Sequence, residues 1–262
     1  GIASLHTRIP QCLFVHDTSF IDTPAFFTGR HFRFYRKNMA SFLEKASTII
    51  THSEYSRTVL LTKYPLITNK AVSLPVYADP VFCIPSDAEK EATKNRHTDG
   101  KEFFLAVTSG HANDNLLNLL KAFSFFKKRQ KSNMQLIIVG NPARSFLEDL
   151  RTYKFRNDVQ VLTNLSEAER AAITAAAYAL VYPVLHDEKG QVLTEAMQCG
   201  VPVIASDTGA LRELMGDAGL TANPAVFEDM AQNMTLLFKD EDLVQQLRQK
   251  GLEQIRSRNK SN

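Results

Sequence analysis

The fold is decided by the stretch ALVYPVLHDEKGQVLTEAMQCGVPVIASDTGALREL, residues 179–214. It runs from an apolar segment through an acidic loop to Gly190, and then through an amphipathic segment and Gly-Val-Pro to a second apolar segment. This order predicts strand, loop, helix and strand, which is the repeating unit of a parallel sheet with crossover helices. Because the helices of such a sheet begin at one edge, their N-termini gather where phosphate groups bind.

Apolar runs of the same length recur along the rest of the chain. They predict strands at residues 12–15, 47–50, 71–74, 103–107, 134–139, 158–162, 179–182 and 202–205. Residues 31–47 and 114–129 predict helices, because their apolar residues recur at intervals of three and four. The expected fold class is α/β, with two Rossmann-like doubly wound parallel-sheet domains, of which the first is incomplete.

A polar segment separates the two halves. Residues 85–102, PSDAEKEATKNRHTDGKE, have few apolar side chains and many charges, which predicts a linker. Residues 1–84 are short for a doubly wound domain and lack a Gly-rich opening turn, so we interpret them as the C-terminal portion of the first domain. Residues 103–262 are expected to form the second domain.

The composition is that of a globular protein, with 44% hydrophobic and 9% aromatic residues. No apolar run approaches the roughly 20 residues that a spanning helix needs. The cysteines, Cys12, Cys83 and Cys199, are odd in number and far apart, which indicates neither a disulfide framework nor a metal site. We therefore predict a cytoplasmic location.

The positive charge is uneven. Residues 1–80 hold nine Lys and Arg against five Asp and Glu, and the excess gathers at Arg30, Arg33, Arg36 and Lys37. Such a helix is typical either of peripheral contact with an anionic membrane surface or of a solvated helix face. A nucleic-acid partner is not expected, because the basic stretch is short and lacks aromatic platforms.

The loop before the helix at Gln191 carries the candidate chemistry. Gly190 allows the backbone to approach a ligand closely, and the helix start offers unpaired N–H groups and a positive dipole end to a diphosphate. Asp187 in the loop and Glu195 near the second helical turn can reach one ligand from opposite sides. Because carboxylates accept strong hydrogen bonds from hydroxyl groups, this pattern suits a sugar nucleotide.

These residues resemble the family-4 retaining glycosyltransferases (glycosyl transferases group 1), whose hallmark is EGFGLPxLEAMACGxPVxAS followed by L-x-E. The matching sequence here is DEKGQVLTEAMQCGVPVIASDTGALREL. Shorter segments agree, namely VHDTSF at 15–20, EKASTIITHSEYSR at 44–57, FFLAVTSG at 103–110, NLLNLLKAF at 115–123 and LIIVG at 136–140. The resemblance spans about residues 10 to 255 and implies the two-domain GT-B fold.

The resemblance implies a nucleoside-diphosphate-sugar donor held by the C-terminal domain and an acceptor held by the N-terminal one. Glu195 would hold the ribose hydroxyls, and Asp187 would contact the donor sugar opposite His16. His16 and Asp187 are thus the candidate catalytic residues. The candidate donor-binding residues are Ser109, Gly110, Glu188, Lys189, Gly190, Gln191, Val192 and Glu195. The protein's task would be to stabilise the leaving diphosphate electrostatically, and neither a cofactor nor a metal is expected.

The sequence departs from the family pattern at the donor phosphates. Where most members have Arg-Lys, this chain has Asn113 and Asp114. A unit charge pair at 4 Å is worth about 4 kcal/mol at an effective dielectric of about 20, so repulsion in place of attraction would weaken donor binding strongly. Lys189, Arg144 or His111 could supply the missing positive charge, and Lys189 is the best placed by sequence.

The predicted function is transfer of a sugar, with retained configuration, to a glycan, lipid-linked or other hydroxyl acceptor. A non-catalytic GT-B relative that binds a nucleotide or a protein partner is the alternative, favoured by Asp114. A phosphorylase-like or epimerase-like enzyme should also show a Lys or Arg cluster for phosphate, which the sequence lacks. His52 and His111 are expected to be structural or surface residues.

Overall fold

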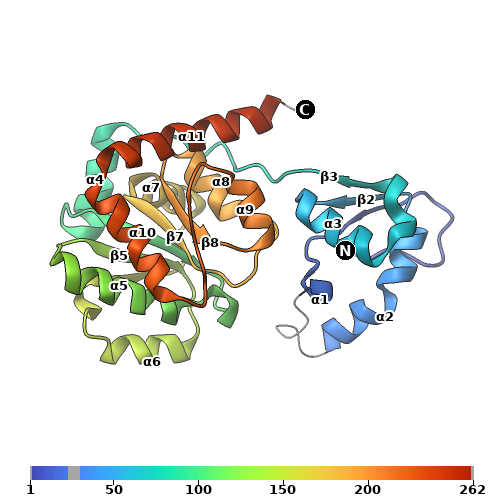
Figure 1. Ribbon diagram of the computed structural model, residues 1–262, viewed down its shortest axis with the longest axis horizontal. Coiled ribbons are helices and arrows are strands. Elements are labelled where there is room, and N and C mark those ends of the chain that lie inside the picture. The colour runs from blue at the N-terminus through green and yellow to red at the C-terminus, as the bar shows by residue number, and fades with distance from the viewer. Residues whose placement is uncertain (1, 23–29, 261–262) are drawn as a thin grey trace. The chain divides into compact units, whose positions relative to one another are not determined.

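The computed structural model describes residues 2–22 and 30–260 and divides into two compact units (Figure 1). The N-terminal unit is Gly1–Val76 together with two later segments, His186–Gly190 and Gly209–Leu214. The C-terminal unit is the rest of the chain. The later segments follow strands of the C-terminal unit, but their contacts belong to the N-terminal unit and are described with it.

The N-terminal unit is built on a three-stranded parallel sheet. The strand order is β1 (Cys12–Phe14), β2 (Thr48–Thr51) and β3 (Ala71–Ser73). Its helices are α1 (Ser19–Asp22), α2 (Arg30–Lys45), α3 (Glu54–Lys63) and the 3-10 helix η2 (Pro65–Lys70). Met39, Phe42 and Leu43 of α2 form one buried cluster with Leu13 and Ile49 of the sheet. The predicted strands and the apolar stripe of α2 are confirmed.

The C-terminal unit is a six-stranded parallel sheet in the order β6-β5-β4-β7-β8-β9. The strands are β4 (Phe103–Thr108), β5 (Gln135–Gly140), β6 (Val159–Leu162), β7 (Ala179–Tyr182), β8 (Val203–Ser206) and β9 (Leu220–Ala222). The remaining helices are α4 (Asp87–Thr98), η3 (Ala112–Asp114), α5 (Leu116–Gln130), α6 (Arg144–Thr152), η4 (Arg156–Asp158), α7 (Glu167–Ala176), α8 (Gln191–Gln198), α9 (Gly209–Met215), α10 (Phe227–Lys239) and α11 (Glu241–Lys260).

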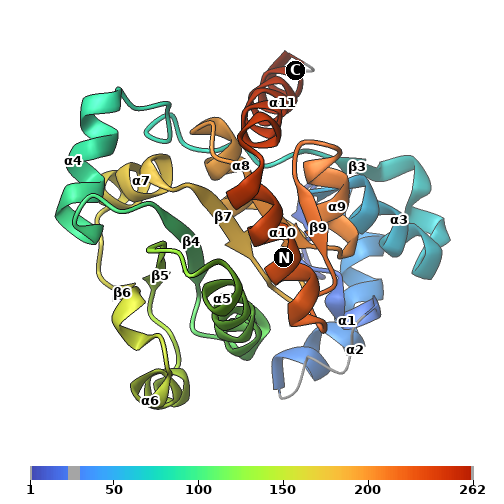
Figure 2. The ribbon, with the colours of Figure 1, turned by 60° about the vertical axis from the view of Figure 1, so that its left-hand side comes forward.

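Helices cover both faces of this sheet. Figure 2 shows α5 and α10 on one side of it and α4 and α7 on the other. Burial on both faces explains why β4, β5, β7 and β8 are apolar along most of their length instead of alternating with polar residues. The rings of Phe104 and Phe126 meet edge to face in the core, with centroids 5.3 Å apart.

The strand order reverses between β4 and β7, which are neighbours in the sheet. In doubly wound sheets a ligand crevice lies outside the carboxyl ends of the strands at this point. The two loops that follow these strands are tied together, because the Leu185 N–H donates to the Asn113 carbonyl at 2.9 Å and the Asn115 amide donates to the Pro183 carbonyl at 3.0 Å. The fold therefore brings both candidate loops to the switch point.

The linker interpretation of residues 85–102 is wrong at α4. Ser86 and Glu89 form a capping box, in which the Ser86 hydroxyl accepts from the Glu89 N–H and the Glu89 carboxylate accepts from the Ser86 N–H at 2.8 Å. The helix packs on α7 with only Lys94 and Thr98 buried, so it has no apolar stripe to reveal it. The C-terminal unit accordingly begins at Tyr77, before this segment.

Among the described strands, β9 is the one that the sequence analysis does not predict. It has three residues, and it pairs with β8 through Ile204 and Leu220, Ala205 and Thr221. So short a run cannot be distinguished from a turn by its pattern alone. Its addition completes the six-stranded sheet.

Candidate functional site

Helix α8 begins at Gln191, as predicted. Gly190, immediately before it, has φ +57°, and a Cβ there would lie 2.4 Å from Leu214 Cδ1. Backbone conformation and packing therefore both favour glycine at this position. Gln191 and Val192 lie in the first turn of α8, whose N–H groups have no acceptor within the helix. The helix start retains the features on which the predicted diphosphate contact depends.

Glu188 holds the loop after β7 in place. Its side chain is 1% exposed. One oxygen accepts from the N–H and the hydroxyl of Thr18, both at 2.5 Å, and the other accepts from the Ser56 hydroxyl at 2.6 Å. The predicted donor contact of Glu188 is at odds with this geometry, because its oxygens are already occupied inside the N-terminal unit.

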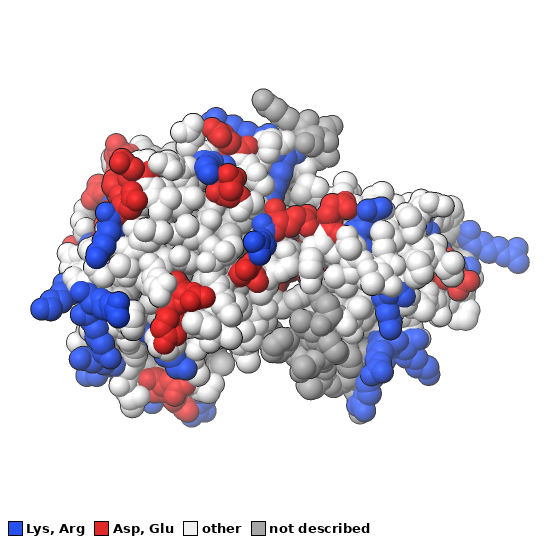
Figure 3. All heavy atoms as spheres, viewed as in Figure 1, with Lys and Arg blue, Asp and Glu red and all other residues white. Residues whose placement is uncertain are grey.

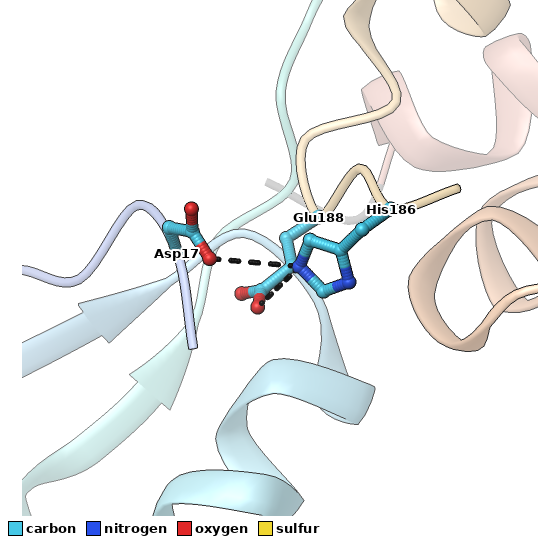
Figure 4. A group of neighbouring side chains, drawn as sticks. All are labelled: Asp17, His186 and Glu188. Atoms are coloured by element: carbon cyan, nitrogen blue, oxygen red, sulfur yellow. Dashed lines mark hydrogen bonds and ion pairs between the residues drawn. The ribbon is translucent and has the colours of Figure 1, made fainter. Parts of the chain in front are cut away.

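His186 contacts two carboxyl groups through one ring nitrogen (Figure 4). Its Nε2 is 3.5 Å from Asp17 Oδ1 and 3.2 Å from Glu188 Oε1. Burial opposes protonation of His186, but the hydrogen bonds to Asp17 and Glu188 outweigh it and raise the pKa to about 10. The pKa of Asp17 is lowered, because hydrogen bonds from His186 and Ser19 outweigh the effect of its burial. The raised pKa of His186 therefore favours a protonated ring whose Nε2 faces both carboxyl groups at neutral pH.

The ligand atoms of Asp17, His186 and Glu188 lie within 4.8 Å of one another, close enough for one metal ion to contact all three. A metal ion binds only neutral imidazole, so it would have to displace the proton that the two carboxyl groups favour on His186. The oxygens of Glu188 also accept the hydrogen bonds from Thr18 and Ser56. The geometry therefore fits a hydrogen-bonded ionic bridge better than a metal centre.

The candidate catalytic residues His16 and Asp187 both belong to the N-terminal unit. Asp187 is half-buried and accepts a hydrogen bond from the Lys189 N–H at 2.9 Å. His16 is exposed beyond the end of β1, and its ring hydrogen-bonds the ring of His52. Burial and then the positive charge of Lys189 lower the pKa of His16. The catalytic roles of these two residues stay predictions.

The turn after β4 is closed by Asp114, which is 5% exposed. Its Oδ2 accepts from the Thr108 hydroxyl at 2.6 Å and from the N–H groups of Ser109 and Gly110 at 2.8 and 2.9 Å. The Ser109 hydroxyl and the His111 N–H also donate to this carboxylate. Successive N–H groups of this kind form a concave anion site, which here is filled by the chain's own carboxylate.

This geometry calls for a different interpretation of Asp114, which stands where most family members have a lysine. The charge that the sequence analysis treats as repulsive is buried and stabilised by five hydrogen bonds from its own turn. The N–H groups of Ser109 and Gly110 point at Asp114. Their predicted donor contacts are therefore at odds with the structure, since a phosphate would have to displace this carboxylate.

Glu195 is 2% exposed and is paired with a cation of α7. Arg170 donates to both of its oxygens, at 2.5 and 3.2 Å, and the Gln191 amide donates to one of them at 3.0 Å. The guanidinium of Arg170 in turn lies 4.6 Å from the centre of the Phe82 ring. A carboxylate can accept about four hydrogen bonds, so Glu195 retains room for one further donor such as a hydroxyl.

Sequence reasoning missed four side chains that hold these carboxylates. They are Thr18, Ser56, Arg170 and His186. Thr18 and Ser56 lie inside the matched segments VHDTSF and EKASTIITHSEYSR, so the motif contained them without showing what they contact. Arg170 is 25 residues from Glu195 and joins it only once α7 and α8 pack.

A comparison with protein families matches residues 87–254 to the family described as Glycosyl transferases group 1. Among curated relatives, O-antigen chain mannosyltransferase B of Escherichia coli is 24% identical over 253 residues, covering 92% of this chain and 64% of the relative. The O-antigen chain mannosyltransferase RfbU of Salmonella typhimurium strain LT2 is 26% identical over 231 residues, covering 85% of this chain and 60% of the relative. The chain thus spans less than two thirds of the length of either relative.

Solved structures share the fold. HepE of Anabaena in complex with UDP-glucose matches with a TM-score of 0.81 at 18% identity, covering 96% of this chain and 68% of that one. WaaG, a glycosyltransferase involved in lipopolysaccharide biosynthesis, matches with a TM-score of 0.77 at 17% identity, covering 94% of this chain and 71% of that one. These likenesses confirm the predicted α/β fold class.

Proposed function

The chain belongs to the glycosyl transferases group 1 family, and from that premise we propose that it is part of a retaining glycosyltransferase. The reaction moves a sugar from a nucleoside-diphosphate-sugar to a hydroxyl group of a glycan or lipid-linked acceptor. The first turn of α8, Glu195 and Lys189 are the residues we propose for the donor, and His16 and Asp187 remain the candidate catalytic residues.

One observation carries this proposal. Gly190, with its left-handed φ, leads directly into α8, and Glu195 follows on the same helix with room for one more hydrogen bond. The N-terminal end of α8 suits the diphosphate of a nucleoside diphosphate. The carboxylate of Glu195 suits its ribose hydroxyls. The family match covers this helix.

The leaving diphosphate must then be stabilised by groups outside the turn after β4. Asp114 occupies the N–H groups of that turn, so we assign the diphosphate to the first turn of α8 and to the exposed Lys189. Positive charge and N–H donors fixed at that position stabilise the charge that develops as the glycosidic bond to the diphosphate breaks. This assignment keeps Lys189 as the replacement for the family lysine.

The relatives suggest which donors to test first. Two of the curated relatives are O-antigen chain mannosyltransferases, and one structural neighbour was solved with UDP-glucose. We therefore propose a hexose as the transferred sugar, with GDP-mannose as the first candidate donor and UDP-glucose as the second.

The basic side of α2 supports an acceptor at a membrane surface. Arg33, Arg36 and Lys37 are exposed, and Figure 3 shows Lys and Arg side chains gathered over the region of α2; the side chain of Arg30 lies outside the described residues. Within residues 2–22 and 30–260, no helix combines the length and apolar character needed to cross a bilayer. Charge attraction to anionic lipids is the contact we propose for this helix.

A non-catalytic relative is the second candidate function, and two observations favour it. Asp114 fills the anion site after β4, and Arg170 already neutralises Glu195. A chain that keeps the fold while its own side chains occupy the ligand groups could serve as a nucleotide sensor or as a partner-binding module. The two candidates differ in whether a sugar nucleotide binds through Glu195.

Calorimetric titration with GDP-mannose, UDP-glucose, GDP and UDP tests the proposal. We expect micromolar binding of one nucleotide pair, weakened at least tenfold in Glu195→Ala because the ribose hydroxyls lose their acceptor. Glu167→Ala is the matched control, since Glu167 also lies near Arg170, at 3.6 Å, but is exposed. Failure of all four ligands to bind the parent chain would favour the non-catalytic candidate.

A further inference from the structure

A planar cation, Arg170 of α7, contacts both oxygens of Glu195. Its Nη1 donates to Oε2 at 2.5 Å, and its Nη2 donates to Oε1 at 3.2 Å. Two donors on one rigid guanidinium fix the orientation of the carboxylate as well as compensating its charge. The carboxylate plane therefore cannot turn without breaking one of the two hydrogen bonds.

Helix α8 itself supports this cation. The Gln198 amide of α8 donates to the carbonyl oxygens of Phe82 at 2.7 Å and of Asp79 at 2.9 Å. The side chain of Phe82 is fully buried, and the Arg170 guanidinium lies 4.6 Å from the centre of its ring. The helix that carries Glu195 thus also holds the segment whose aromatic ring contacts the cation of Glu195.

A third donor occupies the same carboxylate. Gln191, in the first turn of α8, is exposed, and its amide nitrogen donates to Oε1 of Glu195 at 3.0 Å. An ionised carboxylate has about four acceptor positions, two on each oxygen. Arg170 and Gln191 fill both positions of Oε1, and Arg170 fills one position of Oε2. Within residues 2–22 and 30–260, one acceptor position therefore remains, on Oε2.

The 2′- and 3′-hydroxyls of a ribose are neighbours, and a carboxylate with both oxygens open can accept from both of them. We propose that Arg170 and Gln191 restrict Glu195 to a single ribose hydroxyl. Arg170 is a positioning residue, and the Gln191 amide occupies the position that a second hydroxyl would need. The small exposed fraction of Glu195, 2%, agrees with access for one group instead of two. This inference rests on the proposed function.

Binding of deoxyribonucleotides tests the number of hydroxyls held. GDP and UDP are titrated by calorimetry against their 2′-deoxy and 3′-deoxy forms, with the parent chain and with Glu195→Ala. The part of each loss in affinity that disappears in Glu195→Ala belongs to the carboxylate. For the base that binds, we expect this part to be about tenfold for one deoxy form, the loss of one hydrogen bond to a charged group, and within about twofold for the other.

Two variants should open a second acceptor position. Gln191→Leu removes the side-chain donor and keeps the backbone N–H, so both deoxy forms should bind about tenfold more weakly than the ribonucleotide. Arg170→Lys keeps the charge but loses the contact with both oxygens, and it should give the same pattern. Gln245→Leu is the matched control, because it removes the same kind of hydrogen bond, from an exposed Gln to Glu241, on α11. It should keep the parent pattern.

Nitrogen-15 NMR of the Arg170 side chain adds an arm that needs no ligand. We expect resolved Nη signals in the parent, because both groups are hydrogen-bonded, and merged signals in Glu195→Gln. Merged signals in the parent, or equal Glu195-dependent losses for its two deoxy forms, overturn the proposal. Resolved signals with neither GDP nor UDP bound contradict the proposed function, and the single hydroxyl with it, but not the positioning of Glu195 by Arg170.

Discussion

Two neighbouring strands, β4 and β7, each lead into a loop that buries a carboxylate, and the two carboxylates are stabilised in opposite ways. Asp114 after β4 receives its hydrogen bonds from residues at most six positions away in the chain. Glu188 after β7 receives its hydrogen bonds from Thr18 and Ser56, which are 170 and 132 positions away. One loop is closed by its own backbone, and the other by a separate part of the chain.

This difference determines which parts of the fold must form before each carboxylate finds its partners. The carboxylate contacts of Asp114 are local and form with little loss of chain entropy, whereas the contacts of Glu188 form only when the N-terminal unit is folded. The segment 186–190 precedes the candidate diphosphate site at α8. Its conformation, and with it that site, should therefore respond to changes in the N-terminal unit.

The largest expected effect comes from Glu188→Gln. The amide has one acceptor oxygen instead of two and leaves the donors of Thr18, Ser56 and His186 partly unsatisfied in a buried place. Removing one partner of a buried charged pair costs about 3–5 kcal/mol. We expect urea denaturation, followed by far-UV circular dichroism, to show a loss of this size for the N-terminal unit.

Asp187→Asn is the control for that change, because Asp187 is on the same loop but is only half-buried and accepts from the local Lys189 N–H. We expect it to cost about 1 kcal/mol or less. Hydrogen exchange at residues 17–19 should show whether the loss lies in the N-terminal unit. Equal stability of the two variants would contradict the long-range role assigned to Glu188.

A smaller and local effect is expected from Asp114→Asn. Its Oδ2 accepts from three groups at 2.6 to 2.9 Å, and an amide nitrogen at that place could accept none of them. We expect a loss of about 2–3 kcal/mol, with faster hydrogen exchange at residues 109–111 and no change at residues 17–19. Asp149→Asn, at an exposed site of α6, is the control. Faster exchange in both segments would mean that the two loops are not independent.

The same distinction explains what the sequence could predict. The strands, α2 and the start of α8 follow from patterns that repeat within a few residues, and the structure confirms them. The capping box at Ser86 and Glu89 was also readable, but α4 was missed because a helix that buries little lacks an apolar stripe.

The site is less predictable because its electrostatics are long-range. The sequence placed Glu188 correctly in the loop before α8 and Glu195 on that helix, but it could not show which cations and hydroxyls they contact. Arg170 and His186 act on these carboxylates only through packing. The partners of Asp114 are all local, so its role in the turn could have been predicted from the sequence. Asp often accepts hydrogen bonds from N–H groups of its own turn.

The smallest effect expected is a pH dependence confined to the loop after β7. The pKa of His186 is raised in the folded chain to about 10 from 6.5, so its contribution to stability is complete below pH 6.5. That contribution is lost as the pH rises through 10, when the positive charge facing Asp17 and Glu188 disappears. A shift of this size corresponds to about 5 kcal/mol by linkage. We expect only about 1.5 kcal/mol of it, at the low end for charged hydrogen bonds, because both contacts exceed 3 Å.

Hydrogen exchange between pH 6 and 10, corrected for its intrinsic pH dependence, should show this loss at residues 17–19 and none at residues 109–111. Lysines and tyrosines also titrate near pH 10, so His186→Gln is the variant that isolates the effect. Without an ionisable group at this position, residues 17–19 should keep the same corrected exchange across the range. A parent chain that behaves like His186→Gln would mean that His186 is neutral when folded, and the metal site set aside above would then become the better account of Asp17, His186 and Glu188.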